Sequence, residues 1–188
     1  MLKQTLAGLR VLLVLTVILG ILYPLGIWVL SRVPGLHDNA EGSLITANGQ
    51  VVGSALIGID PVAADPNHDP WFHTRPSAVS DPSTSGGSNL GASNPDLVAL
   101  IQQRKDLIAK REGVDQSAIP ADAVTASASG LDPDISPAYA LLQAPRVARE
   151  NNVPLGRVRQ LIDEHTVGLG VHVLELNLAV RSAAQGAH

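Results

Sequence analysis

The residues with the clearest potential for chemistry form a short glycine-rich stretch, Ser85-Gly86-Gly87-Ser88-Asn89. Consecutive glycines let a backbone point several N–H groups at one anion, and the serine and asparagine side chains add further polar contacts. The stretch could therefore bind a phosphate of a nucleotide. It lacks the lysine and the spacing of a P-loop, however. From the residues alone we favour the alternative, an ordered turn whose polar side chains bond to its own backbone.

His68, Asp69 and His73 are a second candidate, because imidazole and carboxylate groups bind transition metals. Their spacing matches no established ligand pattern, and they lie in a polar segment, so we expect no metal site. Asp132 and Asp134 flank a proline, and we interpret them as turn and capping groups. Neither serine of the glycine-rich stretch lies in the Gly-x-Ser-x-Gly elbow of hydrolases, and no catalytic residue is predicted.

The elements that must position these residues begin with a hairpin. Asn48-Gly49 lies between two β-prone runs, residues 43–47 and 50–58. This dipeptide predicts a type I′ turn, because both central positions of that turn need positive φ.

A long loop, residues 60–94, carries the candidate residues and is rich in Pro, Gly, Ser and Asp. Loops of this length are usually functional or disordered. Trp71 and Phe72 in its middle predict that part of the loop packs against the domain.

Three helices are predicted beyond the loop, each from an apolar face with helical spacing. Asn94 caps the first helix, which ends at Gly113. Ser136 caps the second, and we expect Pro145 to limit it. The third covers residues 154–165.

The last predicted element is a half-buried strand over residues 171–180, where leucines alternate with Glu175 and Asn177. Strands and helices are thus segregated along the chain, which indicates an α+β fold in a single domain.

An apolar amino-terminal stretch is expected to anchor this domain in a membrane. Residues 11–31 contain no charge and are bounded by Arg10 and Arg32. These roughly 21 residues would span about 31 Å as a helix, which matches the hydrocarbon core of a bilayer. In lipid the backbone must satisfy its own hydrogen bonds, so a single such stretch is expected to be a transmembrane helix. A cleaved signal peptide is the alternative, but the run is longer than a signal peptide's apolar region and offers no small-x-small cleavage site.

Four residues mark this predicted anchor. Val11 begins it, and Leu19 lies near its middle. Pro24 removes one backbone donor and could kink the helix. Trp28 lies near the far end, where an interfacial indole is common. Lys3, Arg10 and the amino terminus precede the span and only Arg32 follows it closely, so the positive-inside rule places the amino end in the cytoplasm.

The predicted organisation is therefore a cytoplasmic amino terminus (residues 1–10), a transmembrane helix (11–31) and a periplasmic domain (32–188) in a bacterial inner membrane. All 17 acidic residues but only 10 of the 13 Lys and Arg lie beyond Arg32, which gives the outer part a net charge of about −7 and argues against nucleic acid as a partner. Cysteine is absent, which excludes a disulfide framework, a thiolate metal site and a cysteine nucleophile.

Four blocks, taken in order along nearly the whole chain, resemble a known family. They are residues 75–78, 85–95, 124–137 with 140–149, and 173–179. Together with the single amino-terminal helix they resemble the C subunit of the Kdp potassium-transporting ATPase of bacteria. The family usually has a Tyr-Asn pair before the glycine-rich stretch, where this chain has a shorter spacer, and a glutamine where Ile59 stands.

The resemblance implies a non-catalytic accessory subunit with no firmly bound cofactor. Its partners would be a potassium-channel-like subunit, a P-type ATPase subunit that hydrolyses ATP and a small single-helix subunit. The family is described as aiding assembly and as a catalytic chaperone that raises ATP affinity, with residues 85–89 likened to the signature loop of transporter ATPases. An outer domain cannot reach cytoplasmic ATP directly, so we expect the effect to travel through the partners. The alternative is a free-standing, membrane-anchored periplasmic binding module or hydrolase.

Overall fold

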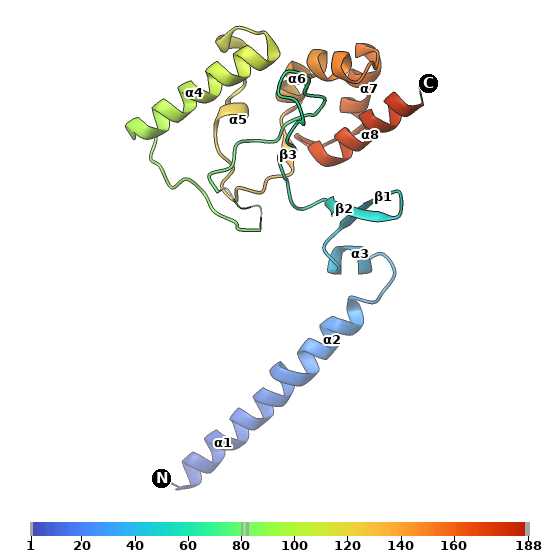
Figure 1. The fold of residues 1–188 in the computed structure, drawn as a ribbon. Coiled ribbons are helices and arrows are strands. Elements are labelled where there is room, and N and C mark those ends of the chain that lie inside the picture. The colour runs from blue at the N-terminus through green and yellow to red at the C-terminus, as the bar shows by residue number, and fades with distance from the viewer. Residues whose placement is uncertain (1, 80, 82, 187–188) are drawn as a thin grey trace. The chain divides into compact units, whose positions relative to one another are not determined.

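The computed structural model describes residues 2–79, 81 and 83–186 (Figure 1). The first residue of the predicted amino-terminal segment and the last two of the predicted outer domain lie outside this part. The chain divides into two compact units, one up to Leu44 and one from Ile45 onward. The elements are mixed helix and strand, which confirms the predicted α+β fold class.

The first unit consists mainly of one long apolar helix. It runs from α1 (Leu2–Val17) through a π turn (Ile18–Leu22) to α2 (Tyr23–Leu30). The helix spans Leu2–Leu30, which includes most of the predicted span 11–31, and its length and composition suffice to cross a membrane once. The π turn ends at Leu22, two residues before Pro24. Pro24 has no N–H to offer the preceding turn, and a widened turn is one way a helix accommodates that loss. A short helix, α3 (His37–Ala40), follows.

The predicted hairpin is confirmed. Strands β1 (Leu44–Ala47) and β2 (Gln50–Ser54) pair with each other. Asn48 and Gly49 have φ angles of 52° and 76°, as a type I′ turn requires.

The described residues of the second unit form four longer helices and a small sheet, and α6 and α8 contact the sheet through β5. The helices are α4 (Pro95–Glu112), α6 (Pro137–Glu150), α7 (Leu155–Glu164) and α8 (Val173–Gln185). A 3₁₀ turn (Gln116–Ala118) and α5 (Ala121–Val124) connect the first two. The antiparallel sheet has the order β3 (Asp134–Ile135), β5 (Gly170–His172), β4 (Thr166–Val167). Ala and Val dominate the core, and Phe72 from the long loop is fully buried in it, as expected for that part of the loop.

Helix starts follow the sequence signals. The Asn94 side chain accepts a hydrogen bond from the N–H of Asp96, and Gly113 ends α4 with a φ of 68°. The Ser136 side chain likewise caps α6. Pro145, however, does not limit α6, which continues to Glu150. Pro145 is exposed, and the carbonyl that it leaves unbonded belongs to Leu141 on the same exposed face, where water can satisfy it.

The predicted strand over residues 171–180 is wrong for most of its length. The strand β5 ends at His172, and α8 begins at Val173. The buried positions of α8 are Val173, Leu176, Asn177 and Val180, which follow the helical spacing i, i+3, i+4, i+7. The alternating leucines suggested a strand, but Asn177 is buried, and with it the buried positions follow helical spacing.

Candidate functional site

The main polar feature of the domain is a set of side chains that hold an extended loop segment, residues 69–73, inside the structure. Two side-chain amides replace the strand partners that this backbone lacks. Asn177 of α8 accepts from the N–H of Phe72 at 2.8 Å and donates to its carbonyl at 2.9 Å. Gln143 of α6 accepts from the N–H of His73 at 2.8 Å and donates to its carbonyl at 3.2 Å. Buried backbone groups need partners of this kind, so these amides make the burial of Phe72 possible.

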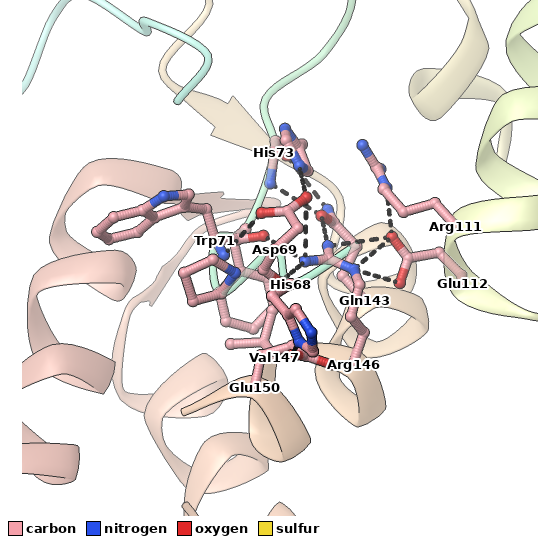
Figure 2. A network of polar contacts seen from close by, with 12 residues as sticks. His68, Asp69, Trp71, His73, Arg111, Glu112, Gln143, Arg146, Val147 and Glu150 are labelled. Atoms are coloured by element: carbon pink, nitrogen blue, oxygen red, sulfur yellow. Dashed lines mark hydrogen bonds and ion pairs between the residues drawn. The ribbon is translucent and has the colours of Figure 1, made fainter. Parts of the chain in front are cut away.

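Arg146 extends the same network (Figure 2). It is 4% exposed and donates to the carbonyls of Asp69 and Trp71 at 2.6 and 2.9 Å. Its guanidinium also bonds to both carboxylate oxygens of Glu112, whose side chain is fully buried, at 3.0–3.2 Å. Arg111 supplies a second cation to Glu112 at 2.7 Å. The result is a buried, hydrogen-bonded ion pair that joins α4, α6 and the loop.

His73 lies between two carboxylates. Its Nδ1 is 3.1 Å from Oδ1 of Asp60, and its Nε2 is 2.5 Å from Oδ2 of Asp69. A neutral imidazole has one N–H, so bonding to both acids requires the doubly protonated cation. Burial opposes that charge, but the hydrogen bonds to Asp60 and Asp69 outweigh it, and the pKa of His73 is raised.

Asp69 responds in the opposite direction. Its burial favours the neutral acid, yet the hydrogen bond from His73 and the charges of His73 and Arg146 lower the pKa of Asp69 to about 2. Asp69 is therefore ionised at neutral pH, and its negative charge favours the protonated form of His73. The two opposite charges compensate each other inside the domain.

The sequence-predicted metal candidates do not converge on one point. His68 is exposed and faces Glu150, with its Nδ1 3.1 Å from Oε2, whereas His73 faces Asp60 and Asp69. Within residues 2–79, 81 and 83–186 no group of three or more His, Asp or Glu could hold a metal. The Asp132 carboxylate accepts a hydrogen bond from the N–H of Asp134, which is the first residue of β3.

The glycine-rich stretch packs against residues 128–130 rather than opening into a cavity. The hydroxyl of Ser85 and the N–H of Gly86 both donate to the carbonyl of Ser129, at 2.9 and 2.8 Å. A Cβ at Gly87 would lie 2.9 Å from the carbonyl oxygen of Ala128. Ser88 and Asn89 are exposed.

A glycine can be required either because its backbone is left-handed or because a neighbour leaves no room for a Cβ. The residue of the stretch with positive φ is Asn89, at 54°, while Gly86 and Gly87 are not among the residues in the left-handed region. Gly87 is required by the close approach of Ala128. The need for glycine at position 87 is therefore steric and does not come from a left-handed backbone.

Sequence reasoning missed the residues that carry the polar network: Asp60, Glu112, Gln143, Arg146 and Asn177. One signal was available. Gln143 and Arg146 lie at helical spacing among Tyr139, Ala140 and Val147 on the apolar face of α6, and a polar residue on such a face needs a buried partner.

At the end of the apolar helix the predicted anchor residue Trp28 has a defined neighbour. The guanidinium carbon of Arg32 lies 5.4 Å from the centre of the Trp28 ring, and Arg32 also pairs with Glu41 at 3.3 Å. The side chains of Val11, Leu19 and Trp28 are each more than half exposed, as a helix that faces lipid or a partner requires.

These features define a class of protein in which one apolar amino-terminal helix precedes a small α+β domain with a compensated polar interior. A family model described as KdpC, the c chain of K+-transporting ATPase, matches residues 5–182. The chain therefore belongs to the KdpC family, and the resemblance found in the sequence is confirmed.

Three relatives illustrate how complete the similarity is. The potassium-transporting ATPase KdpC subunit of Kineococcus radiotolerans is 42% identical over 195 residues, which cover 98% of this chain and 96% of that protein. The KdpC subunit of Mycobacterium tuberculosis is 43% identical over 190 residues, covering 95% and 97%. That of Streptomyces coelicolor is 43% identical over 212 residues, covering 96% and 93%.

Proposed function

We propose that this chain is a non-catalytic accessory subunit of a potassium-transporting ATPase complex in a bacterial inner membrane. The observation that carries the proposal is the match of nearly the whole chain to relatives that are named as such subunits. The partners would be a potassium-channel-like subunit, a P-type ATPase subunit and a small single-helix subunit. The chain would aid their assembly and, as a catalytic chaperone, raise the ATP affinity of the P-type subunit without binding a cofactor firmly itself.

The apolar helix supports membrane docking. Its side chains are exposed along its length, and Gly20 and Gly26 are thin points where a partner helix could approach closely. The test is purification in mild detergent. The chain should come out with larger membrane partners, whereas a free-standing binding module or hydrolase would come out alone.

The proposed orientation places the domain outside, from Lys3 and Arg10 before the helix against Arg32 after it. A cysteine placed at Gly186 in this cysteine-free chain should react with an impermeant maleimide in intact cells. Labelling only after lysis would reverse the orientation and allow direct contact with cytoplasmic ATP.

We propose a structural role for residues 85–89, supported by the bonds from Ser85 and Gly86 to Ser129. ATP hydrolysis should be measured against ATP concentration for complexes that carry Ser88→Ala or Asn89→Ala. Unchanged half-maximal ATP concentrations support the structural role. A selective rise in that concentration, with assembly intact, would favour nucleotide binding by this stretch.

A further inference from the structure

A pocket of about 380 Å³ opens on the second unit, between α4, α5 and the loop segments around residues 58–60 and 73–79. Its volume lies within the range of small-molecule sites, about 300–1,000 Å³. It belongs neither to the apolar helix nor to the glycine-rich stretch, and the proposed function does not use it.

Cations dominate the charged lining. Among the described residues that line the pocket are Arg75, Arg104, Arg111 and His73, and the one carboxylate in that set is Asp60. The Asp60 carboxylate already pairs with His73, whose Nδ1 lies 3.1 Å from Oδ1 of Asp60. Behind the lining, Asp132 pairs with Arg75 at 2.9 Å, and Glu112 pairs with Arg111 at 2.7 Å.

Arg104 is the exception. Its Nη1 donates to the carbonyl of Val124 at 2.8 Å, and within the described part of the chain it makes no ion pair. Its partial burial lowers the pKa of the guanidinium, because no carboxylate offsets the loss of water. A partly desolvated cation without a counter-charge favours binding of an external anion.

A second, independent observation comes from Arg75. Its Nε is buried and has no hydrogen-bond partner among the described residues. Buried donors without an acceptor are rare, and each needs an explanation. Water cannot reach this Nε, so it would gain an acceptor only if the Arg75 side chain, which lines the pocket, shifted toward a bound group. Arg104 brings an unneutralised charge to the same pocket.

The remaining lining is apolar, and part of it is exposed at the surface. Ile59 is 58% exposed and Leu107 is 62% exposed, although both line the pocket. Large apolar side chains beside guanidiniums suit a ligand that has an anionic group and an apolar body.

We propose that this pocket binds a small organic anion, whose carboxylate or phosphate is held by Arg104 and Arg75 and whose apolar part covers Leu107 and Ile59. Planar guanidiniums suit both anionic groups, because they donate in a fork that matches carboxylate and phosphate oxygens. The site is independent of the subunit role, since it can be tested on the isolated full-length chain.

The test is calorimetric titration of the full-length protein in detergent micelles with phenyl phosphate and with benzoate. Benzamidine, a cation of similar shape, reports partition into the micelle. We expect at least one of the two anions to bind with one-to-one stoichiometry and benzamidine not to bind. Absence of binding by both anions overturns the proposal.

Variants then locate the site. Arg104→Gln should weaken binding about tenfold or more, the usual effect of losing a charge-assisted hydrogen bond. Lys110→Gln removes the same charge from an exposed position of the same helix outside the pocket and should leave the affinity unchanged. If both variants weakened binding equally, the effect would come from the net charge of the protein and not from Arg104, which would contradict the proposal.

A second pair guards against loss of folding in Arg104→Gln. Leu107 is exposed enough for Leu107→Asp and Leu107→Asn to be tolerated. The aspartate should repel the anion and weaken binding several-fold more than the matched asparagine. Equal affinities for these two variants would overturn the proposal. The proposal is also overturned if no small anion binds and Arg104→Gln impairs co-purification of the complex. The pocket would then bind an acidic side chain of a partner.

Discussion

Removing the charge of Arg146 should destabilise the domain strongly. Arg146→Met keeps much of the buried stem but leaves the fully buried carboxylate of Glu112 with Arg111 alone, and it strips the donors from the carbonyls of Asp69 and Trp71. Breaking a buried ion pair on one side costs about 3–5 kcal/mol. At roughly 3 °C per kcal/mol for a domain of this size, the melting temperature should fall by about 10–15 °C.

The assay is thermal unfolding of the full-length chain in detergent, followed by circular dichroism. The matched control is Arg157→Met, which removes an ion pair with Glu164 whose side chains are 42% and 43% exposed. Exposed pairs contribute about 0–1 kcal/mol, so the control should melt within a few degrees of the wild type. Glu112→Leu added to Arg146→Met should recover part of the loss, because it removes the stranded charge. A fall no larger than that of the control would refute the reasoning.

Three further outcomes are expected. The folded pKa of His73 is raised, so its stabilisation is complete below the unfolded pKa of about 6.5 and is lost as pH rises through the folded value. His73→Gln should therefore flatten the decline of the melting temperature above about pH 6.5; an unchanged decline would assign it to other groups. Gly87→Val should lower the melting temperature through collision with Ala128, whereas Ser88→Ala should cost at most about 1 kcal/mol; equal melting temperatures would contradict the close packing. Leu19→Arg should cost about 2.5–3.5 kcal/mol on insertion scales and reduce the membrane-bound fraction after cell fractionation; a mature chain that starts beyond the helix would identify a signal peptide instead.

The elements that could be predicted are those fixed by neighbouring residues. Asn48-Gly49 supplies both positive φ angles of its turn, and Asn94 and Gly113 set the two ends of α4. These signals act within a few residues and do not depend on the rest of the fold. The fold class followed from them, even though one element was assigned wrongly.

The elements that could not be predicted depend on distant partners. Asn177 resembles a solvent-facing residue of a strand, but it is buried because its amide pairs with the backbone of Phe72, 105 residues away in sequence. Gln143 reaches His73 across 70 residues in the same way. A polar residue on an apolar helix face indicates that a buried partner exists but not which residue it is. The network around His73 could therefore be identified only from the structure.

The hydrogen bonds that the glycine-rich stretch already makes limit what it can bind. A phosphate-binding nest needs N–H groups that point outward and lack acceptors. Here the Gly86 N–H and the Ser85 hydroxyl both donate to Ser129, and the space above Gly87 is taken by the Ala128 carbonyl. To hold a phosphate the stretch would have to give up these two hydrogen bonds, each a net contribution of about 0.5–1.5 kcal/mol. The pocket lined by Arg75 and Arg104 differs, because the charge of Arg104 has no counter-ion among the described residues and no ion pair must be broken there. An anion that binds this domain should therefore choose the arginines over the glycines.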